Sequence, residues 1–148
     1  MKKRKKKAGQ IILRCPYCGR NARIRPASYV YGQDTLDTES FLYVCDGYPA
    51  CDAYVGAHKE SRLPKGTLAN GRLRHKRILA HRALDAIWKR GYMTRHSAYI
   101  WLQTKLFLRE QDMHIAKFSD YYCEQTIREC NEFIKWHQEN RKGGKKCA

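Results

Sequence analysis

Four of the seven cysteines in this 148-residue chain fall in two close pairs. Cys15 and Cys18 are separated by two residues, and Cys45 and Cys51 are separated by five. Thiolates at such short spacings are the usual ligands of structural zinc, which binds four sulfurs tetrahedrally at about 2.3 Å. A shell closed by four thiolates leaves no position for water, so the metal folds the domain without activating a nucleophile. The two pairs therefore predict one structural Zn²⁺ ion held by these four residues.

Two alternatives to this site follow from the same region of the sequence. The paired cysteines could be redox thiols, although no thioredoxin-like alternation of strand and helix surrounds Cys15. His58 follows the second pair closely and could replace one sulfur. The remaining cysteines do not suggest a disulfide, because Cys123 and Cys130 are about 10.5 Å apart along a helix, beyond the roughly 7 Å limit. We expect those two to be small core residues and Cys147, in a basic terminal segment, to be a free thiol.

The segments that carry the paired cysteines have the pattern of a small sheet. Residues 13–58 contain turn-forming glycines and prolines between short tyrosine-rich runs. We interpret these runs as strands, at 22–25, 29–31, 41–44 and 53–55. A linker with Pro64 and Gly66 is expected at 59–66.

Helical periodicity follows this linker. The first helix is expected from Thr67 or Asn70 to Arg90, before Gly91, with one apolar face formed by Leu73, Ala80, Leu84 and Ile87. The second is expected from Thr94 or Ser97 to about Leu108. The third is expected to begin at a Ser119 cap, with one face formed by Cys123, Ile127, Cys130, Ile134 and His137.

These patterns predict an α+β protein, in which a small zinc ribbon of short antiparallel strands precedes a three-helix C-terminal half. The expected organisation is a basic flexible tail at 1–12, the zinc ribbon at 13–58, a helical domain at 67–141 and a basic C-terminal tail at 142–148.

Charge is the second strong signal in the sequence. The formal net charge is +16. Residues 1–7 contribute +6, and residues 59–95 contribute +9, from eleven Lys and Arg against Glu60 and Asp85. Such segregated positive charge favours a polyanion as partner, because Lys and Arg displace the counterions condensed on nucleic-acid phosphates.

Basic and aromatic side chains are the candidate nucleic-acid contacts. His75, Arg82 and Lys89 lie seven residues apart, which places them along the helix face opposite the apolar one, although an ordinary exposed face would look the same. Tyr17 and Tyr48, one in each cysteine pair, could stack on bases or could belong to the ribbon core. The full set of predicted contacts is Lys2, Lys3, Arg4, Lys5, Lys6, Lys7, Arg72, Arg74, His75, Arg82, Lys89, Tyr17 and Tyr48.

Several functional classes are disfavoured. No catalytic signature motif is present, so we expect no enzyme; the acidic cluster Asp34, Asp37 and Glu39 could hold magnesium but is more simply a polar loop. No apolar run reaches the roughly 18 residues of a membrane span or forms a signal peptide, so we expect a cytoplasmic protein. An apolar content of 43% with 11% aromatic residues argues against wholesale disorder.

Two resemblances accompany these patterns. The Cys45–Cys51 segment, with Tyr-Pro before the second ligand, resembles the C-terminal zinc ribbons of bacterial type I DNA topoisomerases, which implies single-stranded DNA binding. A broader match resembles a zinc-finger-containing domain family of unknown function from Gram-positive bacteria and their phages, and implies zinc binding and a ribbon joined to helices. It rests on Cys15-Pro16-Tyr17-Cys18-Gly19, Cys45 with Cys51 to His58, Pro64 to Asn70, Ala80-His81-Arg82 with Asp85 and Trp88, Tyr99 to Leu102, His114-Ile115 and Cys123.

The function expected from the sequence is therefore non-catalytic binding of DNA or RNA with low sequence specificity. The alternative is a protein-interaction module, an inhibitor or adaptor that docks on a host enzyme or a nucleoprotein complex and acts in the host cytoplasm if it is phage-encoded. Trp88, Trp101 and Trp136 fall one to a helix, and an exposed one would mark a partner groove.

Overall fold

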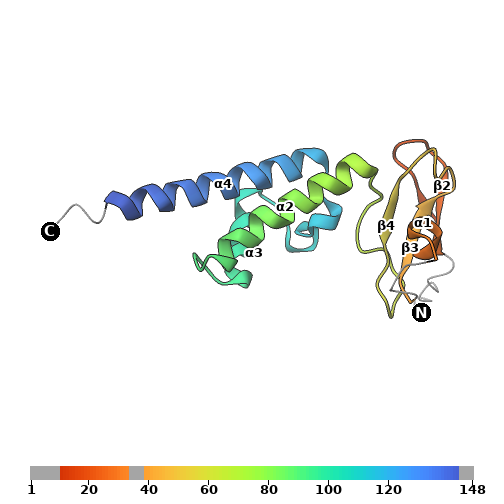
Figure 1. The fold of residues 1–148 in the computed structure, drawn as a ribbon, viewed down its shortest axis with the longest axis horizontal. Helices are drawn as coiled ribbons and strands as arrows, with labels where there is room; N and C mark the ends of the chain where they lie inside the picture. The colour runs from red at the N-terminus through yellow and green to blue at the C-terminus, as the bar shows by residue number, and fades with distance from the viewer. Residues whose placement is uncertain (1–10, 34–38, 144–148) are drawn as a thin grey trace, which may run out of the picture. The chain divides into compact units, whose positions relative to one another are not determined.

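The structure is a computed structural model that describes residues 11–33 and 39–143, without the side chains of residues 142 and 143. It divides into two compact units, Met1–Arg74 and His75–Ala148 (Figure 1). The basic tail at residues 2–7, the acidic residues Asp34 and Asp37, and most of the C-terminal tail lie outside the described residues.

The first unit contains a four-stranded antiparallel sheet, which confirms the predicted fold class of short antiparallel strands. The strands follow one another in the order β1-β2-β3-β4. Their bounds are β1 Leu13–Arg14, β2 Asn21–Pro26, β3 Phe41–Cys45 and β4 Tyr54–Gly56. Strands β2, β3 and β4 are labelled in Figure 1. Neighbouring residues of a strand point to opposite faces, so each face of this sheet has its own core.

One face of the sheet carries the metal-side core. This core contains the fully buried Tyr43, whose hydroxyl donates a 2.5 Å hydrogen bond to the carbonyl of Arg62. Its buried members are Cys15, Ala22, Tyr43, Cys45, Ala53, Val55, Ala57 and Leu68. The opposite face has a smaller core of Ala27, Leu42 and Val44, on which Val30, Tyr48 and Tyr54 pack.

Residues 29–31 do not form the strand that the sequence predicts. They belong to the short helix α1, Ser28–Tyr31. The backbone N–H of Ala27 donates to the carbonyl of Ser40, and the N–H of Tyr31 then donates to the carbonyl of Ala27, which closes a helical turn. Gly32 ends this turn with a φ of 84°.

Two further local features differ from the expectation. The strand β1 is too short to show the alternation that identifies a strand in a sequence. The segment 59–66 also differs from a free linker, since Pro64 forms a β-bridge with Ala57. Beyond it, Ala69 forms a bridge with Tyr54. The chain therefore stays against the ribbon up to the start of the next helix.

The three predicted helices are present, and each begins where its cap predicts. They are α2 Gly71–Lys89, α3 Arg95–Lys105 and α4 Asp120–Gly143, with short 3₁₀ helices at Glu110–Asp112 and Ile115–Lys117. Asn70 Oδ1 accepts the N–H of Leu73 at 3.0 Å, and the Thr94 side chain accepts the N–H of Ser97 at 3.1 Å. These side chains satisfy N–H groups that a helix start otherwise leaves unpaired.

The helical unit has a core of its own. Its buried apolar residues are Ala80, Leu84, Ile87, Ala98, Leu102, Met113, Ile115, Phe118, Cys123 and Cys130. Burial raises the pKa of Cys123 to about 11 and that of Cys130 to about 12, which keeps both thiols protonated, as expected of small core residues. No helix among the described residues is long and apolar enough to cross a membrane.

Candidate metal centre

The four predicted ligands converge on one point of the first unit. The Sγ atoms of Cys15, Cys18, Cys45 and Cys51 all lie within 4.8 Å of one another. The Cys15–Cys51 pair of sulfurs is 3.6 Å apart and the Cys18–Cys45 pair is 3.3 Å apart. A tetrahedron of sulfurs about 2.3 Å from zinc has edges of about 3.8 Å, so the donor set fits one Zn²⁺ ion. The ligand set predicted from the sequence is confirmed, and His58 is not part of this cluster.

Tight turns position the first pair of ligands. Cys15 follows β1, and its N–H donates to the carbonyl of Arg20 at 2.8 Å while its carbonyl accepts the N–H of Gly19 at 2.9 Å. Gly19 has a φ of 76°, a left-handed conformation that glycine adopts without steric cost. These contacts turn the chain back into β2 and bring the Cys18 thiol over the Cys15 thiol.

The second pair is positioned by the turn that leaves β3. The N–H of Gly47 points to Cys45 Sγ at 3.4 Å, and the N–H of Cys51 donates to the carbonyl of Gly47 at 2.9 Å. A Cβ at position 47 would lie 2.9 Å from Arg20 Nη1 and 3.3 Å from the Cβ of Cys51. Glycine at this position therefore avoids a close contact with the side chain of the ligand Cys51.

The four thiols have different electrostatic environments. A backbone hydrogen bond from Arg20, assisted by the Cys45 thiol, lowers the pKa of Cys18 to about 6. Burial raises the pKa of Cys45 to about 12, because an isolated thiolate is poorly solvated there. A bound Zn²⁺ ion supplies the positive charge that holds all four sulfurs as thiolates.

The described cysteines also bear on the redox alternative. None of the six cysteines within residues 11–33 and 39–143 forms a disulfide. Four sulfurs this close together can coordinate one metal ion, whereas a redox couple uses only two cysteines. The chemistry that the donor set supports is structural metal binding.

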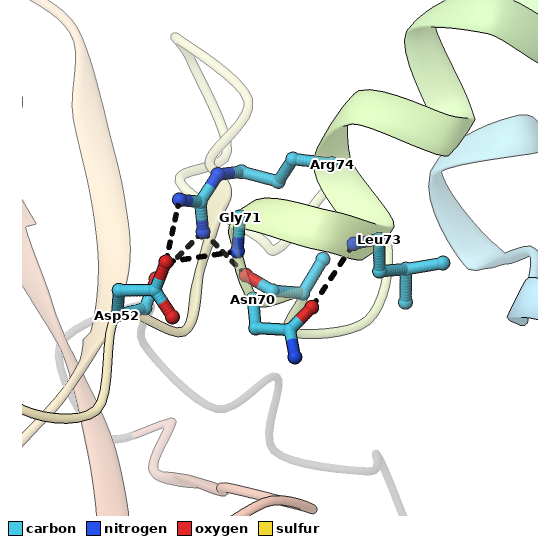
Figure 2. A network of polar contacts seen from close by, with 6 residues as sticks. Asp52, Asn70, Gly71, Leu73 and Arg74 are labelled. Carbon is cyan, nitrogen blue, oxygen red and sulfur yellow. Dashed lines mark hydrogen bonds and ion pairs between the residues drawn. The ribbon is translucent and has the colours of Figure 1, made fainter.

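A polar network joins Asp52, the residue after the ligand Cys51, to the start of α2 (Figure 2). Asp52, next to Cys51, accepts the N–H of Gly71 at 2.9 Å through Oδ2 and forms a 3.3 Å ion pair with Arg74. The Arg74 Nη1 atom donates to the carbonyls of Asp52 and Ala69, both at 2.6 Å. The guanidinium also lies 3.7 Å from the centre of the Tyr54 ring. This network fixes residues 69–74 to the ribbon.

The Asp52→Ala variant tests this network. The substitution removes the acceptor for the Gly71 N–H and the carboxylate that pairs with Arg74. We expect it to lower the free energy of unfolding of the zinc-loaded protein by about 1–2 kcal/mol, measured by urea denaturation. Asp46→Ala is the matched control, because the Asp46 carboxylate makes a single 3.4 Å pair, with an Arg23 side chain that is 56% exposed; this variant should stay within about 0.5 kcal/mol. Equal effects of the two variants would contradict the assigned role.

The predicted nucleic-acid contacts do not all have the same surroundings. Arg72, His75, Arg82 and Lys89 are exposed on α2. Arg74, by contrast, donates three of its hydrogen bonds within the ribbon network described above. Its guanidinium is thus a structural element of the first unit as well as a positive charge.

The two predicted tyrosines also differ from each other. Tyr17 is 44% exposed, whereas Tyr48 is half-buried and packs on Tyr29 with ring centres 5.9 Å apart. Sequence reasoning did not single out Tyr29, which is 48% exposed, or Tyr31, which is 55% exposed. The sequence signal for them is the concentration of tyrosines in the ribbon. Because residues 29–31 are assigned to a strand, the grouping of Tyr29 and Tyr31 with other ribbon tyrosines is not predicted.

Comparison with known protein families gives a match that covers most of the chain. The model of a family described as a zinc-finger-containing domain matches residues 11–133, which includes all four ligand cysteines. No curated protein and no solved structure matches the chain.

Proposed function

Since this chain belongs to the family of zinc-finger-containing domains, we propose that it is a non-catalytic nucleic-acid-binding protein whose ribbon is folded by structural zinc. The observation that carries this proposal is the row of exposed basic side chains on α2. The setting we propose is the cytoplasm, where a reducing environment keeps cysteines available as metal ligands.

The row consists of His75, Arg82 and Lys89, which all lie in the second unit. The buried residues of α2 include Ala80, Leu84 and Ile87, so the basic row occupies the solvent-facing side of the helix. The Lys89 side chain is 63% exposed, and its Nζ lies 3.9 Å from Asp85 Oδ2. This long ion pair is weak, so Lys89 can exchange it for a phosphate. Basic side chains seven residues apart lie about 10.5 Å apart along the helix, so each can contact a different phosphate.

Low sequence specificity and lack of catalysis are parts of the same proposal. Phosphate contacts position a protein on nucleic acid but do not read base sequence. The closed four-sulfur shell offers zinc no open coordination position, and therefore no activated water for hydrolysis.

The test is a binding titration of nuclease-treated, zinc-loaded protein with labelled single-stranded DNA, duplex DNA and RNA at about 50 and 200 mM salt. We expect affinity to fall as salt rises. Each lost phosphate contact changes the slope of log K against log salt by about 0.7–0.9, so Arg82→Gln with Lys89→Gln should flatten it by about 1.4–1.8.

A matched control removes the same charge elsewhere. Lys105→Gln with Lys135→Gln neutralises two exposed lysines on α3 and α4 and should leave the slope unchanged. Absence of binding to all three ligands at the lower salt would overturn the proposal. Equal slopes of log K against log salt for the two double variants would mean that Arg82 and Lys89 of α2 are not part of the nucleic-acid interface.

A groove in the helical unit favours protein docking as the second candidate function. It has a volume of about 280 Å³ and is lined by Trp101, Lys105, Glu129, Glu132, Phe133 and Trp136. Trp136 is 60% exposed, and exposed tryptophans are enriched among residues that dominate binding energy at protein interfaces. If all three nucleic acids fail to bind, a protein partner becomes the better explanation of the formal net charge of +16, and Trp136→Ala is the variant that should abolish its binding.

A further inference from the structure

Four tyrosines gather on one side of the ribbon, the side opposite the metal. Tyr29 and Tyr31 come from α1, Tyr48 from the turn between the second pair of ligands, and Tyr54 from β4. The rings of Tyr29 and Tyr48 are 5.9 Å apart, and those of Tyr31 and Tyr54 are 6.0 Å apart. We refer to these four side chains as the tyrosine face.

The tyrosine face contains an inner and an outer pair. Tyr48 and Tyr54 pack against the small core of Ala27, Leu42 and Val44, so their burial is explained by folding. Tyr29 and Tyr31 are about half exposed, at 48% and 55%, and contact the inner rings. The outer pair therefore offers aromatic surface to a ligand on a support that the inner pair holds in place.

Arginines accompany these rings. The Arg25 guanidinium lies 5.1 Å from the centre of the Tyr29 ring. In the sheet register Arg25 is opposite Leu42 and Arg23 is opposite Val44, so both arginines project on the side of the tyrosine face.

We propose that the tyrosine face is a stacking site for the bases of single-stranded nucleic acid. Bases of an open strand present π-faces that stack on tyrosine rings, and their phosphates lie close enough for the flanking arginines to contact them. In a duplex these π-faces are stacked between neighbouring base pairs, so they cannot stack on the exposed tyrosine rings. The inference rests on the proposed function and names the class of nucleic acid, namely single strands of DNA or RNA.

The test compares two double variants of the zinc-loaded protein. Tyr29→Leu with Tyr31→Leu keeps apolar volume but removes the planar rings, whereas Tyr29→Phe with Tyr31→Phe keeps the rings and loses only the hydroxyls. Tyr121→Leu, at a 62% exposed tyrosine of α4, is the matched control. The ligands are labelled dT₁₂, U₁₂ and a 12-base-pair duplex.

We expect the leucine double variant to bind the two single strands at least about tenfold more weakly, given about 5- to 150-fold in affinity per stacked base. Its duplex affinity and the salt slope for single strands should be unchanged, because no phosphate contact is removed. The phenylalanine variant and the Tyr121→Leu control should bind like the unsubstituted chain. Comparison of dT₁₂ with U₁₂ then separates DNA from RNA as the preferred strand.

Two results would overturn the inference in distinguishable ways. If the unsubstituted chain binds but the leucine variant binds single strands equally well, the tyrosine face is refuted and the proposed function stands. If the unsubstituted chain binds none of the ligands, the proposed function fails and the stacking site fails with it.

Photocrosslinking gives a test that does not depend on a variant remaining folded. The unsubstituted protein is irradiated with an oligonucleotide that carries 5-iodouracil, and the attached peptides are located by mass spectrometry. We expect attachment at Tyr29 or Tyr31. Attachment confined to residues 75–141 would overturn the assignment even if the leucine variant does not fold.

Discussion

Replacement of Cys45 by serine is expected to abolish stoichiometric zinc binding and to unfold the ribbon unit. The Cys45 side chain is 1% exposed, its sulfur lies 3.3 Å from that of Cys18, and it faces the N–H of Gly47. A serine hydroxyl is a poor zinc ligand beside three thiolates. The serine side chain is also shorter than that of cysteine, so its oxygen does not reach the position of the sulfur. Structural zinc supplies about 10–16 kcal/mol in small domains, which is comparable with or larger than the whole stability of a domain.

The measurement is the zinc content of the purified variant together with its hydrogen exchange. We expect fewer than one bound zinc per chain and loss of amide protection in β2, β3 and β4. Cys147→Ser is the control, because Cys147 lies outside both cysteine pairs in the sequence, and it should keep one zinc ion. Retention of one zinc ion by Cys45→Ser would contradict the four-cysteine site.

The metal site could be predicted from the sequence because its determinants are local. The spacings Cys15 to Cys18 and Cys45 to Cys51 each fit a single turn, and two such turns are enough to surround an ion. Helix starts are local in the same sense, since Asn70 and Thr94 cap N–H groups only three residues away.

The tyrosine face could not be predicted because it depends on a contact that is distant in sequence. Alternating Tyr29, Val30 and Tyr31 favour a strand by composition. The hydrogen bond from Ala27 to the carbonyl of Ser40 extends the pairing of β2 with β3 by one residue. The N–H groups of Tyr31 and Gly32 then donate to the carbonyls of Ala27 and Ser28, which turns the chain into a helix. A helical turn therefore replaces the strand that β-propensity favours, and it places Tyr29 and Tyr31 against the rings of Tyr48 and Tyr54, which are distant in sequence.

The basic block from residue 59 to 95 shows the same limit in its charges. A count of Lys and Arg cannot separate side chains that are available to phosphates from those already engaged in the fold. Lys76 forms ion pairs with Asp120 and Glu124, which lie 44 and 48 residues further along the chain. Arg74 likewise contacts Asp52, 22 residues before it. Only the fold reveals that some of this positive charge is structural.

Arg77 is the strongest case of such a structural cation, and its removal is expected to cost about 3 kcal/mol of unfolding free energy. Although it lies within the basic block, its side chain is on the buried face of α2 and is 8% exposed. Its Nε donates a 3.0 Å hydrogen bond to the carbonyl of Phe118, a residue that is itself 1% exposed. Arg77→Ala removes this charge-assisted bond and also leaves the space of the aliphatic stem empty.

The discriminating experiment pairs Arg77→Ala with Arg82→Ala, five residues further along the same helix. Urea denaturation should show a loss of about 3 kcal/mol for the buried arginine and a change within about 0.5 kcal/mol for the exposed one. Nucleic-acid binding is measured without urea, at a temperature at which both variants are folded. It should show the reverse order, because only Arg82→Ala should reduce the affinity and the slope of log K against log salt. Arg77→Met, which keeps the apolar stem, should recover part of the lost stability. A weak effect of Arg77→Ala on unfolding, combined with a clear effect on binding, would instead place Arg77 in the nucleic-acid interface and contradict its assignment to the core.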